Sequence, residues 1–274
     1  MTVPAHDLTA GVAPPRPLIA VLQSNYLPWK GYFELMRRAD LFVLLDSVQS
    51  TKNDWRNRNR IKTAQGLRWL TVPIHHAMHR RIHEVEVASP GWSRKHLRTI
   101  EQAYARAPYM IAYRPWLEDL LTRAGAMQRL SDVNRLMLQA LARELAIGTP
   151  IVRAEDLVPV AALDAAAPDE RLVAICAAAG ARSYLSGPAA SAYLREAIFK
   201  QAGLEVYRIS YAGFPTYPQL HGPFEHRVSV LDALLMLGPD VGQAFDRACW
   251  AGPWSDEGPK HSGDDGSCAD DDCS

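Results

Sequence analysis

The stretch from Ile19 to Ile61 constrains the fold of this chain more than any other part of its sequence. Apolar runs at 19–22 and 41–45 are typical of buried strands, and apolar residues at helical spacing lie between them. A strand, a helix and a second strand in such close succession predict two parallel strands joined by a crossover helix. The sequence therefore predicts an α/β fold with a mostly parallel, Rossmann-like sheet flanked by helices, and an inserted or C-terminal helical portion.

Later segments extend this pattern. Strands are predicted at 69–74, 151–153, 183–186 and 204–209, and helices at 91–121, 130–145, 169–179, 190–201 and 229–237. An Ala-rich linker, which is also a candidate sub-boundary, is predicted at 160–168. We expect a flexible leader over residues 1–17, one α/β domain over 18–239 and a disordered acidic tail over 255–274.

Composition sets further bounds on this 274-residue chain. Lys and Arg together number 30, as do Asp and Glu, so the formal net charge is zero and does not indicate a nucleic-acid or membrane partner. No apolar run reaches the roughly 20 residues that a membrane-spanning helix needs. The first residues lack the apolar core of a signal peptide, and the four cysteines do not resemble a disulfide framework. A cytoplasmic location is therefore expected.

Polar side chains follow the first two predicted strands. Gln23, Asn25 and Tyr26 come after the first strand, and Asp46 and Gln49 come after the second. Ligands of open parallel sheets bind outside the carboxyl ends of the strands. The sequence therefore predicts a binding site formed by these two polar clusters.

Residues 50–60 are expected to form a cationic loop next to this site. Trp55, Arg58, Asn59 and Arg60 belong to it, and Arg side chains bind phosphate or carboxylate groups through two parallel hydrogen bonds. The alternative is an ordinary solvated basic loop, and both interpretations remain open.

A second strand-to-helix turn contains Tyr184, Ser186 and Gly187. Small residues at such a turn let a ligand approach the backbone amides of the following helix, which favour anions. An ordinary tight turn is the alternative. A nucleophilic role for Ser186 is disfavoured, because the sequence is not a Gly-x-Ser-x-Gly elbow.

Two groups of residues have competing interpretations. His96 lies on an apolar helical stripe and is either a general base or a buried core histidine. His75, His79 and His83 are four apart, as in a helical metal site, but the alternation that follows them favours a hairpin, and no metal ligand set is predicted. Cys176, on an apolar helical face, is expected to be a buried thiol.

Several stretches together resemble the WbqC-like family: QSNYLPWKGYFELMRRADLFVLLDSVQ, WRNRNRIK, WLTVPI, KHLRTIEQAY, ERLVAICAAAGARSYLSGPAASAYL and YPQL. The resemblance spans about Leu18 to Pro239. It implies a setting in O-antigen, other polysaccharide or natural-product biosynthesis, with tailoring of nucleotide-sugars or amino sugars. Two positions depart from the family pattern: Ser24 stands where proline is frequent, and Ser47 where a second acidic residue is frequent. The first stretch also faintly resembles the opening of HIGH-motif nucleotidyltransferases, whose paired histidines this sequence lacks.

We therefore expect a transferase that moves an acyl or aminoacyl group from a phosphate-bearing or thioester donor to the amine of an amino sugar or related molecule. Its partners would be a small-molecule substrate, such as a nucleotide-sugar, and a carrier protein; the sequence leaves the cofactor unknown. The expected catalytic residues are Asp46, His96 and Tyr26. The expected substrate-binding residues are Gln23, Asn25, Gln49, Trp55, Arg58, Asn59, Arg60, Tyr184, Ser186 and Gly187. A nucleotide-binding, nucleotidyltransferase-like enzyme and a non-enzymatic partner in a biosynthetic complex are the alternatives. Asn25, Asp46, Arg58 and Ser186 are expected to line one cleft.

Overall fold

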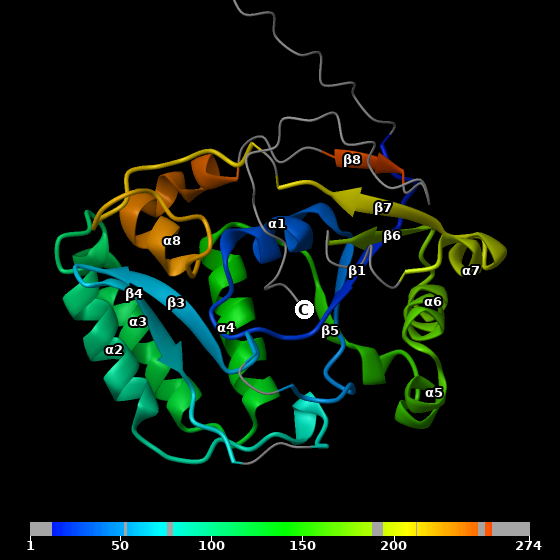
Figure 1. Cartoon of the computed structure of the whole chain (residues 1–274), viewed down its shortest axis with the longest axis horizontal. Coiled ribbons are helices and arrows are strands. Elements are labelled where there is room, and N and C mark those ends of the chain that lie inside the picture. Colours follow the sequence, from blue (N-terminus) through cyan, green and yellow to red (C-terminus); the bar gives the residue numbers. More distant parts are fainter. Residues whose placement is uncertain are drawn as a thin grey trace, which may run out of the picture.

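The computed structural model describes residues 13–51, 54–75, 79–187, 194–211, 213–245 and 250–253. Its main sheet has the strand order β5-β2-β1-β6-β7-β8 (Figure 1). These strands are β1 (Leu18–Leu22), β2 (Leu41–Leu44), β5 (Ile151–Arg153), β6 (Ser183–Ser186), β7 (Glu205–Ile209) and β8 (Trp250–Pro253). The first five in this order run parallel, and β8 pairs antiparallel with β7. The predicted α/β fold with a mostly parallel, Rossmann-like sheet is confirmed.

Helices pack against both faces of the sheet and form two cores. The larger core contains residues of α1 (Lys30–Arg38), α2 (Trp92–Ala103), α3 (Met110–Gly125), α4 (Leu130–Glu144) and α8 (Leu231–Leu237). The smaller core contains residues of α5 (Val160–Ala165), α6 (Pro168–Ala178) and α7 (Glu196–Gln201). Successive strand residues enter opposite cores, as Ala20 and Val21 do, because side chains alternate along a strand. Burial on both faces explains why β1 and β2 are continuously apolar.

The path of the chain through the sheet creates a switch point between β1 and β6. From β1 the chain proceeds through β2 to β5 on one side, and it later returns to fill β6 and β7 on the other. In open α/β sheets, ligands bind outside the carboxyl ends of the strands at such a point. The segment beginning at Gln23 follows β1 and Gly187 follows β6, so both lie at this edge of the sheet.

A separate two-stranded sheet consists of β3 (Arg58–Thr63) and β4 (Gly66–Thr71), paired as a hairpin. The prediction of a loop over residues 50–60 is therefore wrong for its last three residues, because β3 begins at Arg58. The backbone N–H of Ser229, just before α8, donates to the carbonyl of Arg60 at 2.8 Å. Ile61 and Leu70 enter the larger core and attach the hairpin to the domain.

Other element boundaries also differ from the sequence prediction. The linker predicted at 160–168 is mostly helix α5, because Leu163 turns into the smaller core. The helix predicted from residue 190 begins at Glu196, and residues 188–193 lie outside the described part of the chain. Beyond Pro239 the chain continues as a 3-10 helix, η4 (Gly238–Ala244), whose Val241 and Ala244 join the larger core. The leader up to residue 12 and the predicted tail lie outside the described residues.

At the start of α1, a glycine packs closely against an aromatic ring. A Cβ added to Gly31 would lie 2.2 Å from a ring carbon of Trp29. The Trp29 ring is held in turn by the rings of Tyr211 and Phe214, with centroid separations of 4.9 and 6.0 Å. Gly31 therefore lets the β1–α1 loop pack against the loop after β7.

Gly31→Ala is expected to destabilise the fold by about 1–3 kcal/mol, because the added methyl must displace the indole from its ring contacts. Urea unfolding measures the difference. Gly148→Ala is the matched control, since no atom lies within 4 Å of the added Cβ, and it should change stability by less than about 0.5 kcal/mol. Equal unfolding midpoints for Gly31→Ala and wild type would contradict this account.

Candidate functional site

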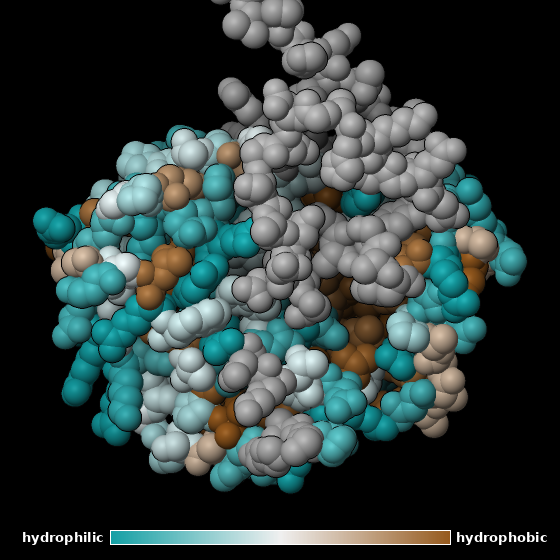
Figure 2. All heavy atoms as spheres, viewed as in Figure 1, coloured by the Kyte–Doolittle hydropathy of each residue, from teal (hydrophilic) through white to brown (hydrophobic). Residues whose placement is uncertain are grey.

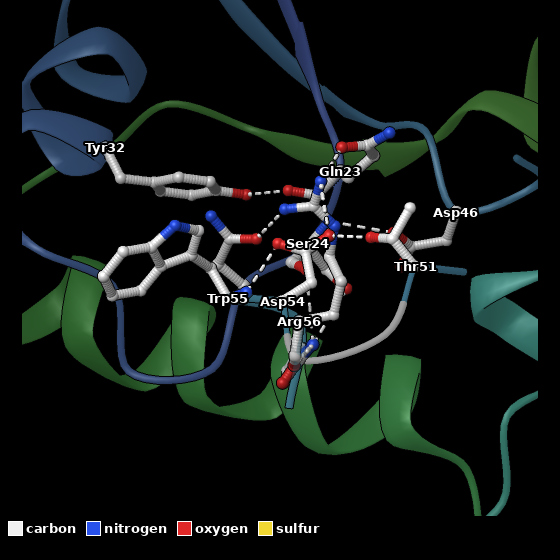
Figure 3. Close-up of polar contacts among 10 residues, drawn as sticks. Gln23, Ser24, Tyr32, Asp46, Thr51, Asp54, Trp55 and Arg56 are labelled. Carbon is white, nitrogen blue, oxygen red and sulfur yellow. Dashed lines mark hydrogen bonds and ion pairs between the residues drawn. The ribbon is translucent and has the colours of Figure 1, made fainter. Parts of the chain in front are cut away.

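The guanidinium of Arg56 organises the carboxyl end of β1. It donates to the side-chain oxygens of Gln23 and Asn25, the latter at 2.5 Å, and lies 3.5 Å from the carboxylate of Asp54 (Figure 3). Arg56 is buried. Its charge therefore fixes the two predicted binding amides in place. The sequence interpretation did not single out this arginine from the other cations of its segment.

Asp46 lies just beyond β2 and next to this network. The backbone N–H of Ser24 donates to its Oδ1 at 2.8 Å, and the Asp46 side chain is almost fully buried. Burial raises the pKa of Asp46, while the hydrogen bonds from Ser24 and the charge of Arg56 oppose that rise. A carboxylate with a raised pKa accepts a proton more readily than an ordinary one, which makes Asp46 a candidate proton acceptor.

A second carboxylate, that of Glu155, lies at the end of the neighbouring strand. The parallel register pairs Leu44 of β2 with Arg153 of β5, so Asp46 and Glu155 each follow by two residues. The negative charge of Glu155 also raises the pKa of Asp46. Sequence reasoning missed Glu155, because only the pairing of β2 with β5 brings it near Asp46.

Buried polar atoms that lack a hydrogen-bond partner gather around Asp46. Ser47 follows Asp46 in the chain, and the backbone N–H of His83 donates to the carbonyl of Asp46 at 3.0 Å. The side chain of Asn134 donates to Ser24 Oγ at 3.1 Å. Among the described residues, five such atoms belong to this neighbourhood: Ser47 Oγ, Arg56 Nε, His83 Nδ1, Asn134 Oδ1 and Glu155 Oε2. Protein interiors pair nearly all buried polar groups. Their concentration here makes this region the candidate site for a polar ligand.

Tyr26 and His96 form a buried pair beneath the hairpin. The Tyr26 hydroxyl lies 2.8 Å from His96 Nδ1, and Tyr26 is fully buried. Burial lowers the pKa of His96 to about 4, opposed by a hydrogen bond to the Thr71 backbone. The imidazole is therefore neutral at pH 7 and joins α2 to the β1–α1 loop and to β4. This arrangement favours a structural role for the pair, and their catalytic assignment stays a prediction.

Asn59 and Gln49 differ in how they relate to the site. The Asn59 amide donates to the carbonyls of Tyr26 and Leu27, at 3.3 and 3.0 Å, and so fixes the loop after β1 from the hairpin. Gln49 is exposed and pairs through its backbone with Arg81. Contact of either residue with a substrate stays a prediction.

Two predicted site residues of β6, Tyr184 and Ser186, lie in different surroundings. Tyr184 stacks on Phe199 with a centroid separation of 5.3 Å inside the smaller core. Ser186 is buried at the same sheet edge as Gln23, and its hydroxyl donates to the Gly187 carbonyl at 3.0 Å. The structure thus brings Asn25 and Asp46 into one network around Ser24 and Arg56. A single cleft that also includes Arg58 and Ser186 stays a prediction.

A second polar cluster fixes the segment that follows β7. Asp232 accepts hydrogen bonds from the hydroxyls of Tyr104 and Tyr217, both at 2.9 Å, and from Gln219 Nε2 at 2.7 Å. The Lys62 ammonium, from β3, donates to Gln219 Oε1 at 3.0 Å. Because these groups satisfy one another, the cluster serves to hold this segment against the hairpin and α8.

The ammonium of Lys30 anchors the same segment from the start of α1. It donates to the Pro215 carbonyl at 2.9 Å and faces the rings of Phe214, Tyr217 and Phe224 at 4.8 to 5.5 Å. Burial lowers the pKa of Lys30 to about 8, opposed by the negative charge of Asp232. The surrounding rings assign this lysine to packing.

The sequence is similar to known proteins over most of its length. Residues 23–244 match the model of the WbqC-like protein family. The chain belongs to the WbqC-like protein family. It is also 38% identical, over 225 residues, to Rv1507c, an uncharacterized protein of Mycobacterium tuberculosis; the alignment covers 81% of this chain and 95% of that protein. No solved structure matches the chain.

The WbqC-like match begins at Gln23, the first residue after β1, and covers Asp46, Arg56, Asn134 and Glu155. Nearly every group described at the strand ends therefore falls within the family region. A separate hollow of about 100 Å³, lined by Arg37, Leu145, Ile147, Gly242 and Phe245, lies by the C-terminal end of α1. Because α1 returns from the carboxyl edge of β1 to the start of β2, this hollow is remote from Asp46.

His75, His79 and His83 of this WbqC-like chain do not share a helix face. Ile74 forms an isolated antiparallel bridge with Val87, as the predicted hairpin requires, but Ile82–Glu84 form a short 3-10 turn, η1, where that prediction placed a strand. Nowhere in the described ranges do three His, Cys, Asp or Glu side chains gather in a metal-binding group.

None of the described helices combines the length and apolar character needed to span a bilayer. Cys176 is buried, as predicted, and burial raises its pKa to about 12.

The lowered pKa of His96 makes stability depend on pH in a defined window. Between its ordinary value of 6.5 and the folded value of about 4, the unfolded chain binds the proton and the folded chain does not. The free energy of unfolding therefore falls as the pH drops through this window, by about 3 kcal/mol at most from this group. His96→Gln is expected to reduce that loss, measured by urea unfolding at pH 7 and pH 4.5. His75→Gln, which changes an exposed imidazole, should keep the wild-type pH dependence. An unchanged pH dependence in His96→Gln would contradict the role of the Tyr26–His96 pair.

Proposed function

We propose that this WbqC-like protein is a cytoplasmic transferase that moves an acyl or aminoacyl group onto the amine of an amino sugar or related small molecule, in polysaccharide or natural-product biosynthesis. The observation that carries the proposal is the Asp46 carboxyl, whose pKa is raised and which is surrounded by buried polar atoms without partners. The resemblance to proteins of polysaccharide gene clusters supports the choice of substrate class.

The reaction requires a neutral amine, because an ammonium group has no lone pair for attack. In the proposal, Asp46 accepts a proton from the acceptor ammonium, and the amine nitrogen then bonds to the acyl carbon of the donor. The bond from that carbon to the oxygen or sulfur of the donor breaks, and the second proton of the amine nitrogen passes to the departing phosphate or thiolate, which leaves a neutral amide. The unpaired Nε–H of Arg56 supports the step, because a fixed donor can stabilise the negative charge on the acyl oxygen.

Glu155 adds a second feature that suits an amine acceptor. Two neighbouring carboxylates attract a cation, and the one whose pKa is raised accepts its proton most readily. The hydroxyl of Ser47 and the imidazole of His83 offer further hydrogen bonds to the hydroxyl groups of a sugar. The acceptor would thus be bound by the β2 and β5 ends, and a carrier protein or free thioester would deliver the acyl group.

The alternative, a nucleotidyltransferase-like enzyme, is favoured by the switch point between β1 and β6, where nucleotides bind in many Rossmann-like sheets. The two reactions release different products. Pyrophosphate from a nucleoside triphosphate indicates nucleotidyl transfer, whereas a new amide mass without pyrophosphate indicates acyl transfer.

Asp46→Asn is expected to lower turnover roughly 100-fold or more, because the amide cannot accept the proton. The assay is mass spectrometry of amino-sugar acceptors incubated with a panel of acyl thioester and nucleotide-linked donors. In wild type, kcat/KM should rise with pH as Asp46 ionises, and Asp46→Asn should lack that dependence. Asp119→Asn, a change on the exposed face of α3, is the matched control and should keep wild-type turnover. Full turnover in Asp46→Asn would refute the assignment.

A further inference from the structure

One face of the β3–β4 hairpin carries cations and exposed apolar groups side by side. The antiparallel register pairs Arg60 with Trp69 and Lys62 with Leu67, and paired residues point to the same side of a sheet. Asn59, Ile61 and Leu70 occupy the opposite, buried side. In Figure 2, hydrophilic residues dominate the side of the molecule that the hairpin occupies, with hydrophobic residues scattered among them.

Two tryptophans and two arginines form one surface on this face, here called the Trp–Arg face (Trp55, Arg58, Arg60 and Trp69). The rings of Trp55 and Trp69 are 5.3 Å apart. The Arg58 guanidinium lies 4.3 Å from the Trp69 ring, and that of Arg60 lies 5.6 and 5.5 Å from the rings of Trp55 and Trp69. Trp69 remains 41% exposed, so a large aromatic surface stays in contact with solvent.

The backbone holds this face in place without a ligand. The Trp55 carbonyl accepts the N–H of Tyr26 at 3.0 Å, and the Trp55 N–H donates to Asp54 Oδ1 at 2.6 Å. Arg60 is fixed on its strand by the Ser229 N–H, and Trp69 by pairing with Arg60. A preformed surface loses little conformational entropy on binding, which favours affinity for a small ligand.

The charge on this face favours an anion. Among the described residues no carboxylate forms an ion pair with Arg60, and its buried Nε has no hydrogen-bond partner. Arg guanidinium groups bind phosphate through two parallel N–H bonds. Indole rings add stacking surface for any planar ring, with further attraction from neighbouring cations. A ligand that matches both features carries a planar ring and a phosphate, as a nucleotide does.

We propose that the Trp–Arg face binds the nucleotide part of the donor, with its base stacked on Trp69 and Trp55 and its phosphates on Arg60 and Arg58. Trp55 is followed directly by Arg56, which bonds the side chains of Gln23 and Asn25, so the face borders the strand-end network (Figure 3). The proposal rests on the proposed function only for what the nucleotide carries. Binding itself is measured without turnover.

Isothermal titration of the full-length protein with UDP, ADP, uridine and pyrophosphate tests the proposal. UDP or ADP should bind more tightly than uridine or pyrophosphate, because only the nucleotides use both the rings and the cations. Trp69→Ala should weaken nucleotide binding roughly 10- to 100-fold and leave pyrophosphate binding unchanged, while Trp69→Phe should restore most of the affinity. Arg60→Ala should weaken both nucleotide and pyrophosphate binding.

Two neighbours supply matched controls. Leu67→Ala removes an equally exposed apolar side chain from the same face, and Arg68→Ala removes an exposed cation from the opposite face. Both should keep nucleotide affinity within about twofold, since stacking and phosphate contacts remain. Thermal unfolding of every variant separates lost binding from lost folding.

The outcomes separate this proposal from the proposed function. Nucleotide affinity that survives Trp69→Ala, or no nucleotide binding at millimolar concentration, overturns the Trp–Arg face. So does binding of a single-stranded oligonucleotide without binding of UDP or ADP. Trp69-dependent nucleotide binding together with full turnover in Asp46→Asn supports the face and removes the proposed catalytic role of Asp46. Transfer that depends on Asp46 but not on Trp69, together with nucleotide binding that does not depend on Trp69, supports the catalytic role of Asp46 and overturns the Trp–Arg face.

Discussion

The charge of Arg56 is the constraint on which the strand-end region depends. A buried guanidinium is costly without hydrogen-bond partners, so the groups that bond the two terminal nitrogens of Arg56 are held firmly once the chain folds. Gln23 and Asn25 come from the β1–α1 loop and Asp54 from the segment before β3, and one guanidinium joins them. Asn134 of α4 adds a bond to the Arg56 carbonyl at 2.9 Å. Arg56 therefore ties the segment before the hairpin to the sheet edge, and the core contacts of Ile61 and Leu70 hold the hairpin itself.

This arrangement divides the cations of residues 56–62 into two kinds. Arg56 and Lys62 are buried and bonded to the protein, at the two ends of the series. Arg58 and Arg60 lie on the solvent side of the hairpin against indole rings. In the proposal, the phosphates of a nucleotide approach this second kind from the solvent side. The alternation of strand side chains produces the division, because every second residue of β3 points to the same side.

The parts of the fold that local pattern controls could be predicted from sequence. Apolar runs such as Ile19–Leu22 and the helical spacing after them defined the parallel sheet, because burial of both faces requires those runs. The strand from Arg58 to Thr63 was not predicted. Its alternating buried residues include the polar Asn59 as well as Ile61, and charged residues stand between them, so the alternation of apolar and polar residues is weak. Helix α5 was not predicted because Leu163 is its one buried residue, a weak local signal.

The strand-end groups show a different limit. Asp46 could be proposed from its place after an apolar run, whereas Glu155 and Asn134 had no such signal, because pairing of β5 with β2 and packing of α4 bring them there. His96 shows the converse, since a titratable residue type suggested catalysis but its burial beside Tyr26 lowers its pKa below the range useful for a base at neutral pH. Residue type identifies what a side chain can do, and only its partners decide whether it is free to do it.

The departure at Ser47 illustrates how tertiary pairing can replace a local motif. Asp46 and Ser47 lie in a turn after β2, so the position where a second acid is frequent carries a buried hydroxyl instead. Glu155 approaches from the adjacent strand and so can lie on the same side as Asp46, with its charge acting on the Asp46 pKa. The negative charge of Glu155 disfavours ionisation of Asp46, so the Asp46 carboxyl keeps its proton to a higher pH than it would alone. In the proposed reaction, the ends of β2 and β5 thus supply the two carboxylates that a cationic acceptor would meet, although no second acid directly follows Asp46 in the chain.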